Sequence, residues 1–165
     1  MPPVRLLVTN SVRKFQWRLA SRACRFRGVM SFEEVTVFAT DLPNVTAGER
    51  WANRTWFVNG KGFVWERPFS KADVKRLGAE VPPAGPILAV AVADLDEKEA
   101  ILAQNHKGLF TIEHFNGYAA LLIQLNVANK RIVRELIIDA WLACAPRILA
   151  DEYSTQLLSS KKKIS

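Results

Sequence analysis

Few residues in this sequence have the chemistry of a catalytic or metal site, and their spacing does not form a catalytic pattern. Glu113 and His114 are the one place where a histidine stands beside a carboxylate, and the other histidine, His106, lies near a predicted helix end. A catalytic histidine needs a nucleophile or a metal as partner, and neighbouring residues of a regular strand point to opposite faces. We therefore expect His114 to have a structural role at a turn. We expect no enzyme activity, no cofactor and no metal site.

The two cysteines and the short glycine-lysine motif also lack the pattern of a metal, disulfide or phosphate-binding site. Cys24 and Cys144 provide neither a disulfide framework nor metal-ligand spacing, and Cys144 falls on the apolar side of a predicted helix. Gly60-Lys61-Gly62 is too short for a phosphate-binding loop and fits a hairpin turn. The apolar run 85–93 is half of the roughly 20 residues that a membrane helix needs. The sequence therefore predicts a cytoplasmic protein without membrane contact.

The net charge of +7 is concentrated at the N-terminus. Residues 1–29 contain seven Lys and Arg and no acidic residue, whereas residues 30–165 contain 16 basic and 16 acidic residues. Overall basicity is therefore no evidence that the folded part binds nucleic acid. Any attraction to a polyanion must come from a local cluster of positive side chains.

Three interpretations of residues 1–29 remain open. The segment is a translated stretch that precedes a true start at Met30, a disordered basic arm that contacts polyanions, or an Arg-rich targeting presequence. Ser31 and Glu34 have the spacing of a capping box at a helix start, and Met30 can pack on Val35. We therefore expect domain structure to begin at residue 30.

The stretch Leu109–Tyr153 is predicted to organise the fold. Leu109–Glu113 and Ala119–Leu125 have the composition of strands, and Asn116-Gly117 between them predicts a tight hairpin turn. From Asn129 the apolar spacing changes to that of a helix, which Pro146 ends. One apolar stripe of this helix is expected to cover one face of the hairpin; it comprises Ile132, Val133, Leu136, Ile137, Ala140, Trp141 and Cys144.

The upstream sequence predicts further helices and strands. The predicted helices are Phe32–Asp41, a short one over Ser70–Gly78 that Ser70 and Asp73 cap, and Asp96–Asn105 with Asp96 and Glu99 as its capping pair. The predicted strands are Arg54–Val58 and Gly62–Arg67, joined by an Asn59-Gly60 turn, and a central strand Ile87–Val92. Residues 43–50 are expected to form a loop, and residues 146–158 a last turn or helix.

This order of elements predicts an α+β fold of two layers. The order is α-β-β-(α)-β-α-β-β-α, which favours a mainly antiparallel sheet with helices packed largely on one face. The predicted domain covers residues 30–158. It follows the basic extension 1–29 and precedes a basic, solvated tail at residues 159–165.

Several motifs are similar to those of a known family. His114-Phe115-Asn116-Gly117-Tyr118, Asp139-Ala140-Trp141, Ala145-Pro146-Arg147 and the segment Trp56–Phe63 together resemble the MmcQ/YjbR-like family over residues 30–155. The resemblance implies a small α+β fold with a double-wing, DNA-binding function and no chemistry. It also implies contacts at the turns and at the start of the last helical segment. The candidate nucleic-acid-binding residues here are Lys61, Lys107, His114, Asn116, Tyr118 and Arg147.

A second interpretation is a protein- or ligand-binding adaptor. Trp51, Trp56 and Trp65 flank the first predicted hairpin, where aromatic side chains either pack in the core or form an exposed binding surface. Such a surface would bind a protein partner rather than DNA. The sequence does not decide between a monomer and a homodimer joined at a sheet edge.

Overall fold

The structure is a computed structural model, and it describes residues 28–162. The two remaining segments, 1–27 and 163–165, lie outside the described residues, and with them most of the predicted basic extension. The described residues up to Pro146 form one compact unit, whereas the last helix, α6, belongs to a second unit. Each unit is considered by itself.

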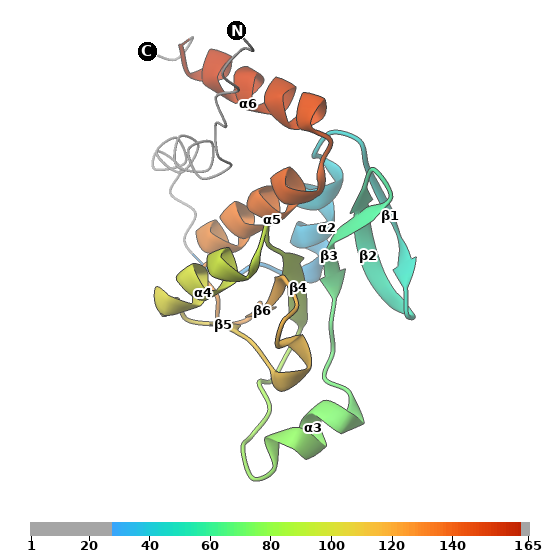
Figure 1. Cartoon of the computed structure of the whole chain (residues 1–165), viewed down its shortest axis with the longest axis vertical. Helices are drawn as coiled ribbons and strands as arrows, with labels where there is room; N and C mark the ends of the chain where they lie inside the picture. The colour runs from blue at the N-terminus through green and yellow to red at the C-terminus, as the bar shows by residue number, and fades with distance from the viewer. Residues whose placement is uncertain (1–27, 163–165) are drawn as a thin grey trace, which may run out of the picture. The chain divides into compact units, whose positions relative to one another are not determined.

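The compact unit is built on a six-stranded antiparallel sheet, in the order β1-β2-β3-β4-β6-β5. This confirms the α+β class (Figure 1). The strands are β1 (Val45–Arg50), β2 (Asn53–Val58), β3 (Lys61–Glu66), β4 (Ile87–Ala91), β5 (Leu109–Phe110) and β6 (Ala120–Gln124). The helices of this unit are α2 (Phe32–Thr40), α3 (Lys71–Leu77), α4 (Leu95–Ala103) and α5 (Lys130–Cys144), with a short 3-10 turn η2 (Glu113–Phe115).

One face of the sheet is covered by the amphipathic helix α5. Across the sheet, Trp56 pairs with Val64, Val64 with Val90, and Val90 with Leu121, so these side chains share a face. Helix α5 packs against β3 and β4, and its Trp141 is fully buried, with its ring N–H donating to the Pro43 carbonyl at 3.1 Å. Helix α2 packs against β1, beside α5 in Figure 1.

The opposite face carries a second, smaller hydrophobic cluster that the sequence did not predict. Trp65, Ala89, Leu122 and Phe110 are successive partners across four strands and share this face. Phe115 of the η2 turn packs onto it, as do Phe69 and Ile112. The central strands β3, β4 and β6 are therefore buried on both faces.

The second predicted hairpin is present, but the prediction of a tight turn between its strands is wrong. Strand β5 has two residues and pairs with β6 through Leu109 and Phe110, so the connection is nine residues long and includes η2. Within it, Asn116 (φ −62, ψ 131) and Gly117 (φ +71) form a type II turn closed by the Tyr118 N–H on the Phe115 carbonyl. The chain leaves the strand early because Ile112 and Phe115 are drawn onto the second face.

Two other predictions required correction. Residues 45–50, predicted as loop, form strand β1; all but Val45 are exposed, so no hydrophobic alternation marks the strand in the sequence. Helix α4 begins at Leu95 with Asp94 as its cap, because the Asp94 carboxylate accepts from the Glu97 N–H at 2.8 Å. The capping boxes Ser31–Glu34 and Ser70–Asp73 are confirmed, as is the Asn59-Gly60 turn with both φ positive.

The last helix, α6, runs from Arg147 to Lys162 and confirms the predicted terminal helix, beyond its expected end. Four of its Ser and Thr hydroxyls donate to carbonyls one turn earlier. Within the described part of the chain, none of the helices is long and apolar enough to cross a membrane.

The turn between β1 and β2 gives a direct test of backbone strain. Trp51 (φ 51) and Ala52 (φ 59) occupy the left-handed region that usually takes Gly or Asn. Ala52→Gly removes the cost at one position and should stabilise the fold by about 0.5–1 kcal/mol. Thermal unfolding should show a melting temperature about 2–3 °C higher.

The matched control is Ala47→Gly in β1, where φ is negative. The free energy of unfolding of this variant should be about 0.5–1 kcal/mol lower, because glycine weakens a strand interior. If both variants lose stability equally, the turn is not strained at Ala52.

Candidate nucleic-acid interface

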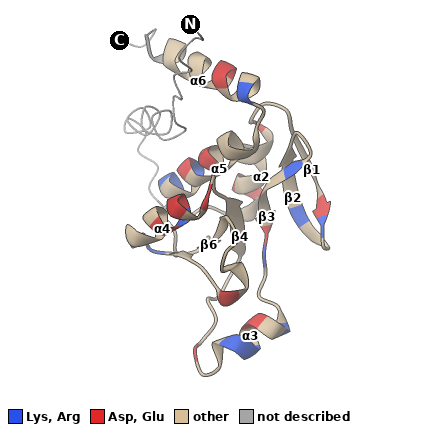
Figure 2. Cartoon of the chain, viewed as in Figure 1, with Lys and Arg blue, Asp and Glu red and all other residues tan. Residues whose placement is uncertain are grey.

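Positive side chains are concentrated in one part of the compact unit. Residues 28–146 hold 12 basic and 14 acidic residues, but residues 49–76 alone hold seven basic and three acidic ones. Residues 94–113 show the reverse, with five acidic residues and two lysines. Figure 2 shows Lys and Arg on β2 and α3, and Asp and Glu on α4. The compact unit is slightly acidic overall and yet has a basic region.

A series of contacts connects this basic region from the β1–β2 turn to α3. The Arg54 Nε lies 3.2 Å from a Glu66 carboxylate oxygen, across from β2 to β3. The next residue, Arg67, donates from Nη2 to the Asp73 carboxylate at 2.9 Å, and Arg76 lies 3.7 Å from the other oxygen of Asp73. We call this the basic surface; its cations are Arg50, Arg54, Arg67, Lys71, Lys75 and Arg76, all exposed except the half-buried Arg67.

Asp73 holds α3 at the end of β3. Its carboxylate is buried and accepts from the Ser70 N–H and hydroxyl as well as from Arg67. Burial alone would raise the pKa of this carboxyl, but the hydrogen bonds from Ser70 and the ion pair with Arg67 outweigh it and lower the pKa below 3.8. The orientation of Lys71, Lys75 and Arg76 therefore depends on one buried carboxylate.

Next to the basic surface lies the 113–118 turn, the segment that contains three predicted site residues. The Arg67 guanidinium lies 5.6 Å from the centroid of the Phe115 ring. Phe115 makes edge contacts with His114 at 6.1 Å and with Tyr118 at 5.6 Å. Tyr118 is 48% exposed and also makes an edge contact with Trp65. His114, Asn116 and Tyr118 thus lie in one exposed turn beside Arg67.

A buried lysine anchors this turn from α4. Lys98 is 6% exposed, and its ammonium group donates to the carbonyls of Phe115 at 2.6 Å and Tyr118 at 3.1 Å. Burial lowers the pKa of Lys98 below 10.5. Sequence reasoning missed this residue, because a lysine among acidic neighbours on a helix resembles an ordinary solvated side chain.

The 3-10 turn also places Glu113 and His114 together on its exposed side, where the His114 ring makes no hydrogen bond to the described residues.

The other three predicted site residues do not join this group. Lys61 is exposed at the β2–β3 turn, at the far end of β3 from Arg67. It lies near Cys144, whose thiol pKa is raised by burial and lowered to a smaller extent by the Lys61 charge. Cys144 is half-buried rather than fully buried. Arg147 belongs to α6, where its Nε lies 3.9 Å from Asp151.

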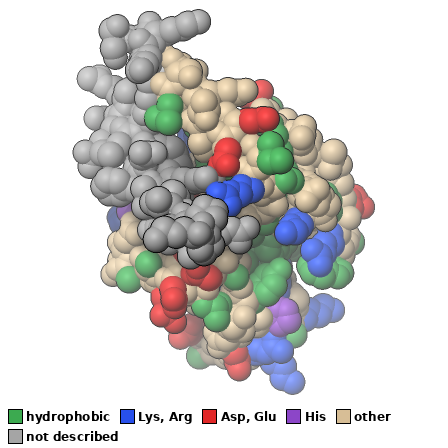
Figure 3. All heavy atoms as spheres, turned by 45° about the horizontal axis from the view of Figure 1, so that its top comes forward, with side chains coloured by type: hydrophobic (Ala, Val, Ile, Leu, Met, Phe, Trp, Pro, Cys, Tyr) green, Lys and Arg blue, Asp and Glu red, His purple; other side chains and the backbone are tan. Residues whose placement is uncertain are grey.

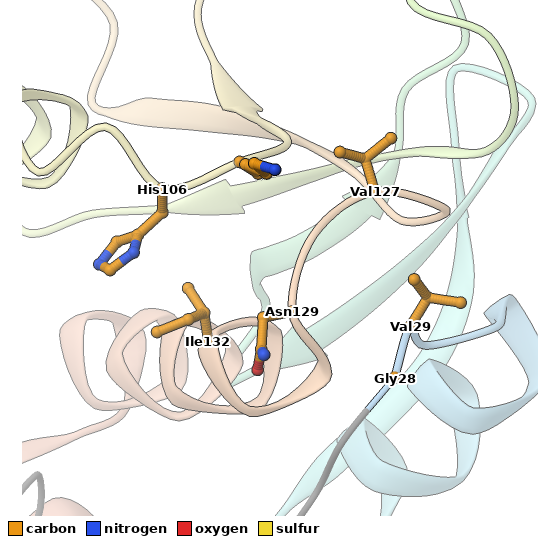
Figure 4. A pocket seen from close by; sticks show the side chains of 7 residues that line it. Gly28, Val29, His106, Val127, Asn129 and Ile132 are labelled. Carbon is orange, nitrogen blue, oxygen red and sulfur yellow. The ribbon is translucent and has the colours of Figure 1, made fainter.

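Lys107 lines a separate pocket of about 420 Å³ at the start of α5 (Figure 4). Two of its polar side chains, His106 and Asn129, already have partners. The His106 ring pairs with Gln104 at 3.1 Å, and Asn129 caps α5 by accepting from the Arg131 N–H at 2.9 Å. Among the described residues, His, Cys, Asp and Glu do not gather in any group of three or more. Among its described lining residues there is no carboxylate to pair with His106.

The three tryptophans of the first hairpin do not form one exposed surface. Trp56 and Trp65 are 1% and 7% exposed, on opposite faces of the sheet, whereas Trp51 is 71% exposed at the β1–β2 turn. The Arg50 guanidinium lies 4.1 Å from the centroid of the Trp51 ring. The space-filling view in Figure 3 shows Lys and Arg side chains interspersed with hydrophobic ones, and acidic side chains both at the lower left and in the upper part of the view.

The role of Asp73 can be tested by the pH dependence of stability. Because its folded pKa lies below 3.8, Asp73 stabilises the fold above that pH, and the contribution is lost as pH falls through the folded pKa. Asp73→Asn should therefore lower the free energy of unfolding at pH 7 by about 1–2 kcal/mol. Denaturant titrations should show this difference shrinking below pH 3.8.

Asp96→Asn on the exposed start of α4 is the control and should change stability by less than about 0.5 kcal/mol. A difference between Asp73→Asn and the unmodified protein that stays constant down to pH 2 would contradict this role of Asp73.

Comparison with known proteins finds relatives in mycobacteria. Over 126 residues the chain is 40% identical to the uncharacterized protein Rv2570 of Mycobacterium tuberculosis and to the uncharacterized protein Mb2600 of Mycobacterium bovis. Each match covers 74% of this chain and 95% of the relative. No family model matches the chain, and no solved structure matches it.

Proposed function

We propose that this chain, which belongs to the same protein family as the mycobacterial proteins Rv2570 and Mb2600, is a non-enzymatic DNA-binding protein. The contact surface in this proposal is the basic surface together with the exposed 113–118 turn. The resemblance to the MmcQ/YjbR-like family supports this function, and membership of that double-wing family is part of the proposal. A cytoplasmic location is also proposed, in keeping with the free thiol of Cys144.

The observation that carries the proposal is that basic and acidic side chains are concentrated in different parts of the compact unit, although the unit as a whole has no net positive charge. Five exposed cations lie on the β1–β2 hairpin and α3: Arg50, Arg54, Lys71, Lys75 and Arg76. The acidic residues among them are partly neutralised, because Glu66 pairs with Arg54 and Asp73 with Arg67. Phosphates attract such local clusters even when the whole domain is neutral.

The geometry of the two elements suits contact with a backbone of phosphates. The hairpin turn and α3 lie at the same end of the sheet, because Arg54 on β2 is paired with Glu66 at the end of β3, next to Arg67. Tyr118 contacts Phe115, whose ring centroid lies 5.6 Å from the Arg67 guanidinium, and Asn116 belongs to the same exposed turn, so both could reach sugars or bases. Phosphate contacts would then position the nucleic acid, and the turn residues would contact its other groups.

Salt-titrated binding to a DNA duplex tests this surface in the full chain. Lys71→Ala with Lys75→Ala should weaken binding and lower the slope of log K against log salt by about two, since each phosphate contact contributes about 0.9. Lys107→Ala, an exposed lysine outside the basic surface, is the matched control and should leave the slope unchanged.

Equal slopes for the double variant and the unmodified chain would contradict the assignment of the surface. The same titration on a chain that begins at Met30 separates the seven basic residues of 1–29 from the domain. If that shorter chain is folded and does not bind at low salt, the domain does not bind DNA, and a protein-binding role becomes the better account.

A further inference from the structure

Trp51 is the most unusual side chain of the basic surface. It is 71% exposed, whereas Trp56, Trp65 and Trp141 are buried. A tryptophan in water at the tip of a hairpin adds nothing to the core, and exposed aromatic side chains of this kind are typical of binding sites. The surface around it is cationic, with Arg50 before it and Arg54 after it.

The backbone holds Trp51 at the tip at a cost in stability. Both residues of this two-residue turn have positive φ without being glycine or asparagine, which is unfavourable for L-residues with bulky side chains. The turn is braced by the Asn53 side-chain amide, which donates to the Trp51 carbonyl at 2.9 Å. Strain of this kind is found at functional sites, where it fixes a side chain before its ligand arrives.

The two faces of the Trp51 ring are not equivalent. Arg50 lies over one face at 4.1 Å from the ring centroid, and the high exposure of the residue leaves the other face open to solvent. An open indole face backed by a guanidinium suits a flat, electron-rich ring, and the same guanidinium can meet an adjacent phosphate. In a duplex, base faces are stacked inside the helix, so such a ring must come from an unpaired base.

We infer that the basic surface takes single-stranded nucleic acid, with one unpaired base stacked on the open face of Trp51. This inference rests on the proposed function and narrows it from phosphate contact to a class of nucleic acid. Lys71, Lys75 and Arg76 would contact the backbone of the same strand. A protein partner would also bury Trp51, but it would not require the surrounding cations. The phosphates of a nucleic-acid strand do require them.

The test uses the full chain with Trp51→Gly, because glycine accepts the positive φ and the turn should still form. Binding to a 20-nucleotide oligothymidylate should weaken by about 5- to 100-fold, the effect of removing one base–aromatic stack. Binding to a 20-base-pair duplex at the same salt should not change. Trp51→Phe should recover most of the single-strand affinity, and Val37→Ala, an exposed apolar residue on α2, should change neither.

The outcomes separate this inference from the proposed function. A selective loss of single-strand binding without a fall in melting temperature supports it, as does quenching of tryptophan fluorescence by the oligonucleotide that disappears in Trp51→Phe. An equal loss on both nucleic acids, or no loss on either, overturns the inference and leaves the proposed function standing. Absence of binding to both at low salt by the unmodified chain overturns the proposed function, and this inference with it.

Discussion

The structure depends on the burial of its central strands on both faces. Helix α5, with Trp141 fully enclosed, packs on one face of the sheet at β3 and β4, and the cluster around Phe115 covers the other face. Neither broad face of the sheet centre is therefore available to a partner. The β1–β2 hairpin, the turns at the ends of the strands and the short helix α3 remain exposed, and the basic surface lies on these parts.

Much of the fold could be predicted because local signals agreed with tertiary packing. The capping boxes at Ser31 and Ser70, the Asn59-Gly60 turn and the apolar stripe with Trp141 are each confirmed. The failures occurred where packing overrides a local signal or leaves none. Strand β1 is exposed on both faces, so it has no hydrophobic period to read. Asn116-Gly117 marks a turn, but burial of Phe115 decides that it is a type II turn inside a longer loop.

The candidate site was less predictable, because it depends on contacts between distant parts of the chain. His114, Asn116 and Tyr118 share one turn, as their spacing suggested, whereas Lys61 and Lys107 lie elsewhere in the compact unit. The cations of α3 join Arg54 only through the pairing of β2 with β3 and through Asp73. A sum of charges over residues 30–165 is zero and conceals this arrangement, since opposite charges gather on different elements of the unit.

The central claim is that a nucleic acid meets this chain at the β1–β2 turn and α3. The most direct measurement is a titration of the isotope-labelled chain with a DNA oligonucleotide at low salt, followed by the backbone amide shifts in NMR spectra. The account predicts the largest shifts at residues 50–54 and 71–76, with smaller ones at 113–118. Shifts confined to the pocket beside Lys107 or to the outer side of α5, or no shifts among residues 30–146, would contradict it.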